Sequence, residues 1–276
     1  MSSAVEIRVL KSNHELRQVQ VLEKEVWNTD PIPLHQTITA SQNGGLLLGA
    51  FIDGNMVGFS YSFPGFRHGK SYLCSHMLGI HPDFQEQGIG ARLKAEQKQF
   101  ASKMGYNLIT WTYDPLESRN AYLNLTKLHA VCSTYIENCY GEMEDSLNSG
   151  LPSDRFKVEW WINSSYVSEP KAIHAANARH IFHWDMTELS FPKLMDIKDG
   201  LSSVRESNQP LYVPVPANFQ ALKNKDGKLS LDWRYKTRQI FQTLFTSGYA
   251  AVSLVKGETA AVCYYLLVKR ELLDLD

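Results

Sequence analysis

A short glycine-containing turn carries the clearest chemical signal in this sequence. Residues 85–90 read Gln-Glu-Gln-Gly-Ile-Gly and lie between the apolar, strand-like residues 71–80 and a segment with helical apolar spacing. Two glycines let the backbone come close to a ligand. The N–H groups that open the following helix have no partner within that helix, and the helix dipole adds positive charge there. Together these features predict a site for an anion such as a pyrophosphate.

Three explanations compete for this turn. A dinucleotide-binding turn needs Gly-x-Gly-x-x-Gly, but Leu93 stands where the third glycine belongs. Tight packing between the strand and the helix explains one glycine more easily than two. The pattern formed by Gln85, Gly88 and Gly90 instead resembles the acyl-CoA-binding signature of the GNAT superfamily of N-acyltransferases, Gln/Arg-x-x-Gly-x-Gly/Ala.

The resemblance implies how acyl-CoA binds. The turn would hold the pyrophosphate through backbone N–H groups, and the preceding strand, the fourth of the GNAT fold, would pair with the pantetheine arm where it splays from the fifth strand. Gly79 would relieve crowding near a bulge of this strand. The implied donor is acetyl-CoA or succinyl-CoA, used as a co-substrate, and no metal is implied. The implied contacts are Leu78, Gly79, Ile80, Gln85, Gln87, Gly88, Ile89, Gly90 and Ala91.

A base is the next requirement, because an amine with a pKa of about 10.4 is almost fully protonated at neutral pH. In a regular strand Cys74, His76 and Leu78 share one face. If Leu78 faces the cofactor, His76 can accept the proton through water, since a histidine has a pKa of about 6.5. The other interpretation is a half-buried strand histidine satisfied by a neighbour.

The helix predicted at residues 116–130 departs from the family pattern. GNAT members often carry Asn-x-x-Ala-x-x-Leu-Tyr-x-Lys-x-Gly-Phe there, with the asparagine at the cofactor and the tyrosine as general acid. Alignment on Lys127 places Leu125 at the tyrosine position. Either another tyrosine supplies the proton or water assists the departing thiolate. The substitutes are Ser118, Asn120 and Asn124 for the cofactor contact and Tyr122 for the acid.

Three arginines are candidates for holding a substrate carboxylate, because a guanidinium can bind one with two hydrogen bonds. They are Arg67, Arg119 and Arg155, and ordinary solvated surface is the alternative for each. Four further segments resemble a bacterial GNAT subgroup of long chains, some of which look like N-succinyltransferases of amino acids. This narrower resemblance implies succinyl-CoA as donor and a small-molecule amine, the α-amine of an amino acid, as acceptor; plain acetylation of a small amine is the alternative. The four segments are residues 25–33, 41–51, 112–128 and 140–161.

Composition limits the class of protein. The chain has 276 residues, 43% of them hydrophobic, which can fill a core. Its 28 basic and 29 acidic residues give a net charge of −1, and no basic run indicates nucleic acid as a partner. The sequence has no apolar stretch long enough to span a membrane and no signal-peptide pattern, so we expect a cytoplasmic location. Four scattered cysteines predict neither a disulfide framework nor a metal site.

The element order resembles that of the GNAT fold, and this resemblance implies an α/β fold with a mixed, twisted sheet whose strands 4 and 5 splay apart. We expect a catalytic domain at residues 1–167 with the order β-α-α-β-β-β-α-β-α-β-β. The predicted elements are a strand at 5–10, helices at 13–27 and 34–42, a hairpin turning at Asp53-Gly54-Asn55, strands at 71–80, 107–113 and 155–162, and the helices after residue 90 and at 116–130.

Residues 168–276 are expected to form a C-terminal α/β extension, with a proline-limited strand at 211–216, a helix at 230–247 and a hairpin. Laying Gly45 on Gly248 keeps the two hairpins of the chain in phase. The extension is therefore either a half-GNAT repeat or a hairpin that merely looks similar. We expect it to form a wall of the pocket or a contact in a homodimer.

Two further hypotheses remain open. The missing tyrosine suggests a CoA-binding sensor or scaffold that has lost catalysis. A protein lysine acetyltransferase would need an open acidic groove, which the sequence does not show clearly.

Overall fold

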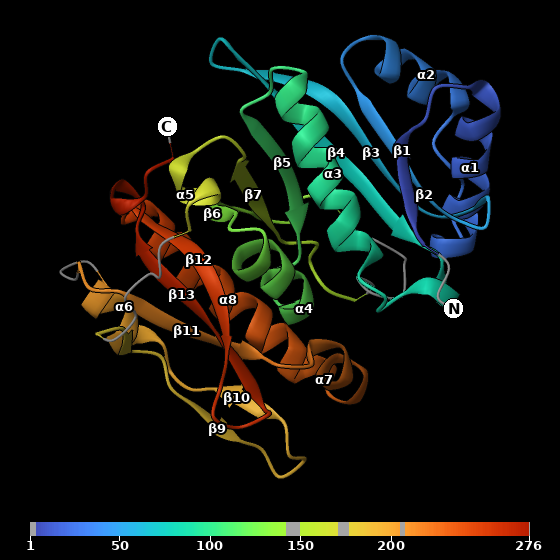
Figure 1. Ribbon diagram of the computed structural model, residues 1–276. Coiled ribbons are helices and arrows are strands. Elements are labelled where there is room, and N and C mark those ends of the chain that lie inside the picture. Colours follow the sequence, from blue (N-terminus) through green and yellow to red (C-terminus); the bar gives the residue numbers. More distant parts are fainter. Residues whose placement is uncertain (1–3, 142–149, 171–176, 205–207, 276) are drawn as a thin grey trace. The chain divides into compact units, whose positions relative to one another are not determined.

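The computed structural model describes residues 4–141, 150–170, 177–204 and 208–275. The chain forms two compact units, Met1–Trp111 (unit 1) and Thr112–Asp276 (unit 2) (Figure 1). Each unit is a set of residues that pack mainly against one another. The predicted domain boundary at residue 167 remains a prediction.

Two helices of unit 1 have the bounds that the sequence predicts, α1 (Asn13–Trp27) and α2 (Leu34–Gln42). A capping box starts α1: the backbone N–H of Ser12 donates to the Glu15 carboxylate at 2.9 Å, and the backbone N–H of Glu15 donates to the Ser12 hydroxyl at 3.2 Å. The apolar face of α1 buries Leu16, Val19 and Leu22 in a core shared with the sheet.

The strands of unit 1 form a sheet in the order β1-β2-β3-β4-β5, antiparallel except for the parallel β4–β5 pair. The β2–β3 hairpin turns at Asp53 and Gly54, whose φ angles of 49° and 81° are left-handed, as a tight two-residue turn requires. The strands are β1 (Glu6–Val9), β2 (Leu46–Ile52), β3 (Asn55–Arg67), β4 (Lys70–Ile80) and β5 (Leu108–Tyr113).

The sheet of unit 1 carries helices on both faces. On one face α1 packs against Phe59 and Tyr61 of β3. On the other face lies α3 (Ile89–Lys103), which bonds Ser62 of β3 and Ser75 of β4 through its own side chains. A short 3-10 turn, η1 (Pro82–Phe84), connects β4 to the glycine turn and α3.

Unit 2 contains a sheet in the order β7-β6-β12-β13-β11-β8 and a separate pair, β9 with β10. The helix α8 (Gly227–Thr246) buries Trp233, Phe241 and Leu244, and Phe241 meets the ring of Phe156 on β7 at 4.7 Å. The strands are β6 (Val131–Ile136), β7 (Arg155–Trp161), β8 (Arg179–His180), β9 (Trp184–Met186), β10 (Pro192–Leu194), β11 (Leu211–Pro216), β12 (Tyr249–Lys256) and β13 (Val262–Lys269). The shorter helices of this unit are α5 (Ser165–Ser168), α6 (Lys198–Val204), α7 (Phe219–Lys225) and the 3-10 turn η3 (Arg270–Leu272).

The predicted helix at 116–130 is shorter than expected and changes type. It begins as α4 (Ser118–Ala121) and continues as the π-helix η2 (Tyr122–Lys127), in which the N–H of Leu128 donates to the carbonyl of Leu123 at 3.0 Å. His129 ends it with a left-handed φ of 55°. Single-turn π segments are frequent at functional sites.

The two hairpins that look alike in sequence differ in strand order. In unit 1, β1 pairs with β2, the first strand of its hairpin. In unit 2, β11 pairs with β13, the second strand of its hairpin. The difference weighs against a half-GNAT repeat.

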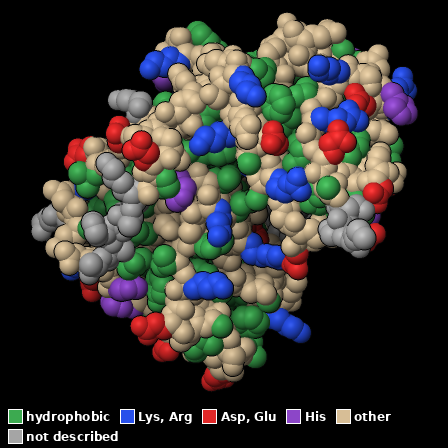
Figure 2. Space-filling model, viewed as in Figure 1, with side chains coloured by type: hydrophobic (Ala, Val, Ile, Leu, Met, Phe, Trp, Pro, Cys, Tyr) green, Lys and Arg blue, Asp and Glu red, His purple; other side chains and the backbone are tan. Residues whose placement is uncertain are grey.

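None of the helices in the described ranges has both the length and the hydropathy needed to span a bilayer. On the face shown in Figure 2, basic and acidic side chains are scattered among apolar and neutral ones.

Candidate active site

The glycine turn opens α3 without a side-chain cap. Gly88 is the N-cap residue and has a left-handed φ of 76°, and Glu86 has a φ of 64°. Nothing lies within 4 Å of the position that a Cβ on Gly88 would occupy. The N-cap position is therefore open, and no side chain caps the first turn of α3, as an anion site requires.

Packing does not explain the second glycine. A Cβ on Gly90 would lie 3.5 Å from Cδ2 of Leu78, an ordinary van der Waals contact. A methyl group would therefore fit at position 90, so packing within the protein does not require a glycine there. Close approach of a ligand to this backbone would account for it.

The two glutamines stiffen the turn. The side-chain amide of Gln85 donates to the carbonyl of Ile80, and that of Gln87 donates to the carbonyl of Asp83, both at 3.4 Å. These long bonds hold the loop while both side chains stay exposed.

Strand β4 contains a bulge at His76. Its pairing with β3 passes from Tyr61↔Met77 to Ser62↔Ser75, so His76 has no residue opposite it. The sequence-based expectation that His76 and Leu78 share one face is wrong, because the extra residue breaks the two-residue period. Leu78 faces α3, whereas the His76 ring meets Tyr61 on the α1 side, with the centroids 5.9 Å apart.

His76 remains exposed, although two aromatic rings flank it. Its ring lies edge-on to Phe63 at 5.6 Å as well as to Tyr61. The partial loss of water around the ring lowers the pKa of His76 below its usual value, so the imidazole is neutral near pH 7 and can accept a proton.

Side-chain packing, and not the bulge, explains the glycine at position 79. A Cβ there would lie 2.7 Å from Cε1 of Phe59 and 2.9 Å from Cη2 of Trp27. The glycine lets the Phe59 and Trp27 rings pack edge-to-face against the strand, with their centroids 5.9 Å apart. The bulge expected near Gly79 lies at His76 instead.

The β4–β5 pairing within unit 1 is short. It consists of Leu73↔Ile109 and Cys74↔Thr110, while β4 runs on to Ile80. The backbone of residues 77–80 keeps its β3 partner on one edge. Its other edge is not used by β5 within unit 1, which is what pairing with an extended ligand requires.

Three of the predicted residues in unit 2 lie around one pocket. Ser118, Arg119 and Tyr122 line a pocket of about 610 Å³ together with the turn between β12 and β13. The Ser118 hydroxyl donates to the carbonyl of Ala217 at 2.7 Å. Asn120 is exposed and does not line this pocket.

Leu125, at the position of the family's tyrosine, is fully buried. Tyr122 is 40% exposed, and the Lys127 ammonium lies 5.5 Å from its ring centroid. Solvent can therefore reach the Tyr122 side chain.

The three arginines have different environments. Arg155 is buried, its guanidinium donates to the carbonyl of Asp154 at 2.9 Å and it lies 3.9 Å from Asp114. It belongs to an ionic cluster in which Arg234 binds Asp114 through two hydrogen bonds of 2.9 and 2.5 Å. Arg67 is exposed at the end of β3, and Arg119 is exposed on α4.

Glu117 is the N-cap residue of α4. Its carboxylate accepts a hydrogen bond from Gln220 at 2.5 Å. Burial raises the pKa of Glu117 above its usual value.

The described residues include no group of histidine, cysteine and acidic side chains able to hold a metal ion.

Residues 13–125 match the model of the acetyltransferase (GNAT) family. The segment is therefore similar to the GNAT family. The resemblance read from the glycine turn and the element order is thereby confirmed at the level of the family, whose members are acyl-CoA-dependent N-acetyltransferases. No curated protein shows significant sequence similarity to the chain.

Several solved structures are similar to the chain. The ribosomal-protein-S18-alanine N-acetyltransferase from Escherichia coli is 16% identical, covers 58% of this chain and 94% of its own, and has a TM-score of 0.47. An N-acetyltransferase from Staphylococcus aureus Mu50 is 16% identical, with 58% and 100% covered and a TM-score of 0.47. The GNAT family N-acetyltransferase YhbS from Escherichia coli, solved in complex with CoA, is 19% identical, with 42% and 66% covered and a TM-score of 0.37.

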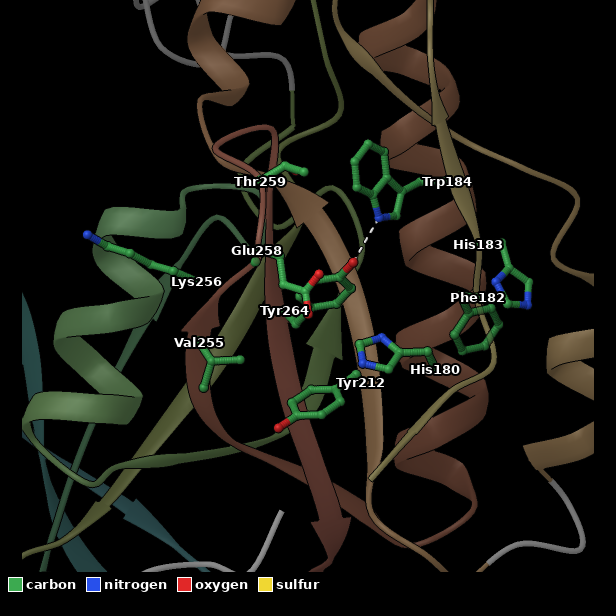
Figure 3. Close-up of a pocket in the computed structure, with 11 residues that line it drawn as sticks. His180, Phe182, His183, Trp184, Tyr212, Val255, Lys256, Glu258, Thr259 and Tyr264 are labelled. Carbon is green, nitrogen blue, oxygen red and sulfur yellow. Dashed lines mark hydrogen bonds between the residues drawn. The ribbon is translucent and has the colours of Figure 1, made fainter. Parts of the chain in front are cut away.

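A second pocket lies outside the GNAT segment, and sequence reasoning missed it. It has a volume of about 470 Å³ and an aromatic wall in which the His180 ring stacks on Tyr212 and meets the edge of Tyr264, both at 4.8 Å (Figure 3). The indole N–H of Trp184 donates to the Tyr264 hydroxyl at 2.8 Å, and Glu258 supplies a carboxylate. The run His-Ile-Phe-His-Trp at residues 180–184 was the available signal.

Proposed function

We propose that this protein transfers an acetyl or succinyl group from CoA to the amine of a small molecule such as an amino acid. The observation that carries the proposal is the turn at residues 85–90. Inside a GNAT-family segment, it joins a left-handed glycine N-cap to an uncapped helix start with open space in front of it.

Binding of the donor follows from two features of unit 1. The N–H groups of Gln87 to Ala91 suit the pyrophosphate, and the free edge of β4 at Leu78, Gly79 and Ile80 suits the amides of pantetheine. In unit 2, Ser118 and Asn120 remain candidate contacts by analogy with the family's asparagine. The Ser118 hydroxyl already has a carbonyl partner, which favours Asn120.

The reaction forms an amide C–N bond and breaks the thioester C–S bond. The acceptor must lose a proton before attack, and a neutral His76 can accept that proton through water. The sulfur leaves with the electron pair of the broken bond and needs a proton or a positive charge. Tyr122, which is exposed, is the candidate for the acid.

The choice of acyl group and acceptor rests on the arginines. Arg67 and Arg119 are the candidates for a carboxylate on the acceptor or on a succinyl group, because both are exposed. Arg155 is already engaged by Asp114 and the carbonyl of Asp154, so we rank it last.

A panel assay tests the proposal. Thiol release from acetyl-CoA and succinyl-CoA is measured against L- and D-amino acids, simple amines and a lysine peptide, and mass spectrometry identifies the acylated product. Turnover with a small amine supports the proposal, whereas turnover with the lysine peptide alone assigns a protein substrate.

One observation favours a second candidate, a CoA-binding sensor without catalysis. The residue at the family's acid position is Leu125, which is buried and apolar. This hypothesis predicts tight CoA binding with no thiol release from any donor and acceptor pair.

A further inference from the structure

Unit 1 contains a buried lysine that the proposed function does not yet use. Lys94 lies on α3 with 4% of its surface exposed, and its side chain points between the helix and the sheet. Lysine is almost never fully buried unless a carboxylate pairs with it. None of the ion pairs among the described residues includes Lys94.

Neutral groups surround the ammonium. Its Nζ donates to the Ser75 hydroxyl at 2.9 Å and to the side-chain carbonyl of Gln97 at 3.0 Å. The amide of Gln97 in turn donates to the hydroxyls of Ser62 and Ser75, at 2.7 and 3.0 Å. The remaining side of Nζ faces the ring of Trp111, with 3.7 Å between the nitrogen and the ring centroid.

The position of Nζ in the sheet is specific. Ser75 directly follows Cys74, and Trp111 directly follows Thr110, and Cys74↔Thr110 is the last pair between β4 and β5 within unit 1. Nζ therefore lies where the two strands stop pairing. Under the proposed function, the β4 edge along which the pantetheine arm lies begins at this point.

The charge of Lys94 is finely balanced. Burial lowers the pKa of Lys94 to about 7, and Cys74 on β4 is the titratable group whose charge acts on it. The partners from α3, β3 and β5 carry no charge. A negative charge arriving nearby would favour the ammonium form, because an opposite charge in a low-dielectric site stabilises it strongly.

We propose that the Lys94 ammonium stabilises the negative charge that develops on the CoA sulfur when the acyl group leaves. The thioester C–S bond breaks, its electron pair stays on the sulfur, and the positive charge at Nζ offsets the new thiolate until a proton from the acid or from water neutralises it. This inference rests on the proposed function and deepens it. It also supplies a way to stabilise the leaving thiolate in a chain where buried Leu125 occupies the position of the usual acid.

The bound sulfur itself gives the test. Thiolates absorb ultraviolet light that thiols do not, so titration of the protein–CoA complex with pH reports the apparent pKa of the CoA thiol. The same titration with dethio-CoA, which lacks the sulfur, removes the absorbance of the protein. We expect the wild type to hold the bound sulfur as thiolate at a lower pH than free CoA does.

Two variants and one control separate charge from structure. Lys94→Met removes the charge at similar volume, and Lys94→Gln keeps a polar neutral group in case the methionine variant folds poorly. Lys103→Met, an exposed lysine on the same helix, is the matched control. We expect Lys94→Met and Lys94→Gln to return the sulfur titration to that of free CoA and to lower kcat about 100-fold, as loss of a charge-stabilising donor does.

The outcomes are distinct. Unchanged sulfur titration in a folded Lys94→Gln variant that still binds CoA would overturn this inference and leave the acyltransferase proposal intact. Failure of the wild-type protein to bind CoA at all would refute both.

Discussion

Replacing Gly88 with glutamate isolates the anion site from the stability of the turn. Gly88 has a φ of 76°, and a Cβ there meets nothing within 4 Å, so the substitution introduces no clash at the Cβ. It does impose a left-handed conformation on a non-glycine residue, which costs about 1–2 kcal/mol. Gly69, at the β3–β4 turn, has a φ of 75° and equally open surroundings, so Gly69→Glu carries the same conformational cost.

The two variants should differ in CoA binding alone. A carboxylate about 5 Å from one pyrophosphate charge is repelled by about 3 kcal/mol at an effective dielectric constant of about 20. That energy weakens binding by about 100-fold or more. Calorimetric titration with CoA, together with thermal unfolding of both variants, measures the two effects separately. Equal CoA affinity in Gly88→Glu and Gly69→Glu would refute the assignment of the turn.

Three further results follow from the geometry. His76→Ala should lower kcat more than it raises KM for the donor; a kcat within about twofold of the wild type would make His76 structural. Asp114→Asn leaves the Arg234 guanidinium buried without its bidentate partner and should lower the free energy of unfolding by about 3–5 kcal/mol in urea titration; a loss below about 1 kcal/mol would mean that solvent reaches this cluster. The hydrogen bond from Arg8 and the backbone N–H groups around Glu15 hold the pKa of Glu15 at about 2. The contribution of ionised Glu15 to the free energy of unfolding is therefore present above the unfolded pKa near 4.5 and is lost as the pH falls toward 2. Glu15→Gln should flatten that part of the stability–pH curve, and an unchanged curve would contradict the shift.

Local sequence signals predicted the elements of unit 1 well, because their ends are encoded nearby. Ser12 and Glu15 fix the start of α1, and the left-handed Asp53 and Gly54 fix the first hairpin. The glycine turn was recognisable for the same reason. Gly88 adopts a left-handed backbone conformation, which glycine reaches without steric cost, so the local sequence indicates it.

Features that depend on distant contacts were not predictable. The bulge at His76 arises from the pairing of β4 with β3, which no local period reveals, and it moved His76 to the opposite face from Leu78. Lys94 occupies the position of an ordinary surface lysine in a helix, and only the packing of α3 against the sheet shows that it is buried. Arg155 looked available in sequence but is engaged by the ionic cluster around Asp114.

Hydrogen exchange of the backbone amides, with and without CoA, tests the central claim most directly. We predict that CoA slows exchange in the turn at residues 85–91 and along β4 at residues 78–80, because those N–H groups would hold the pyrophosphate and the pantetheine arm. Slowed exchange confined to other parts of the chain, with the turn unchanged at saturating CoA, would contradict the account.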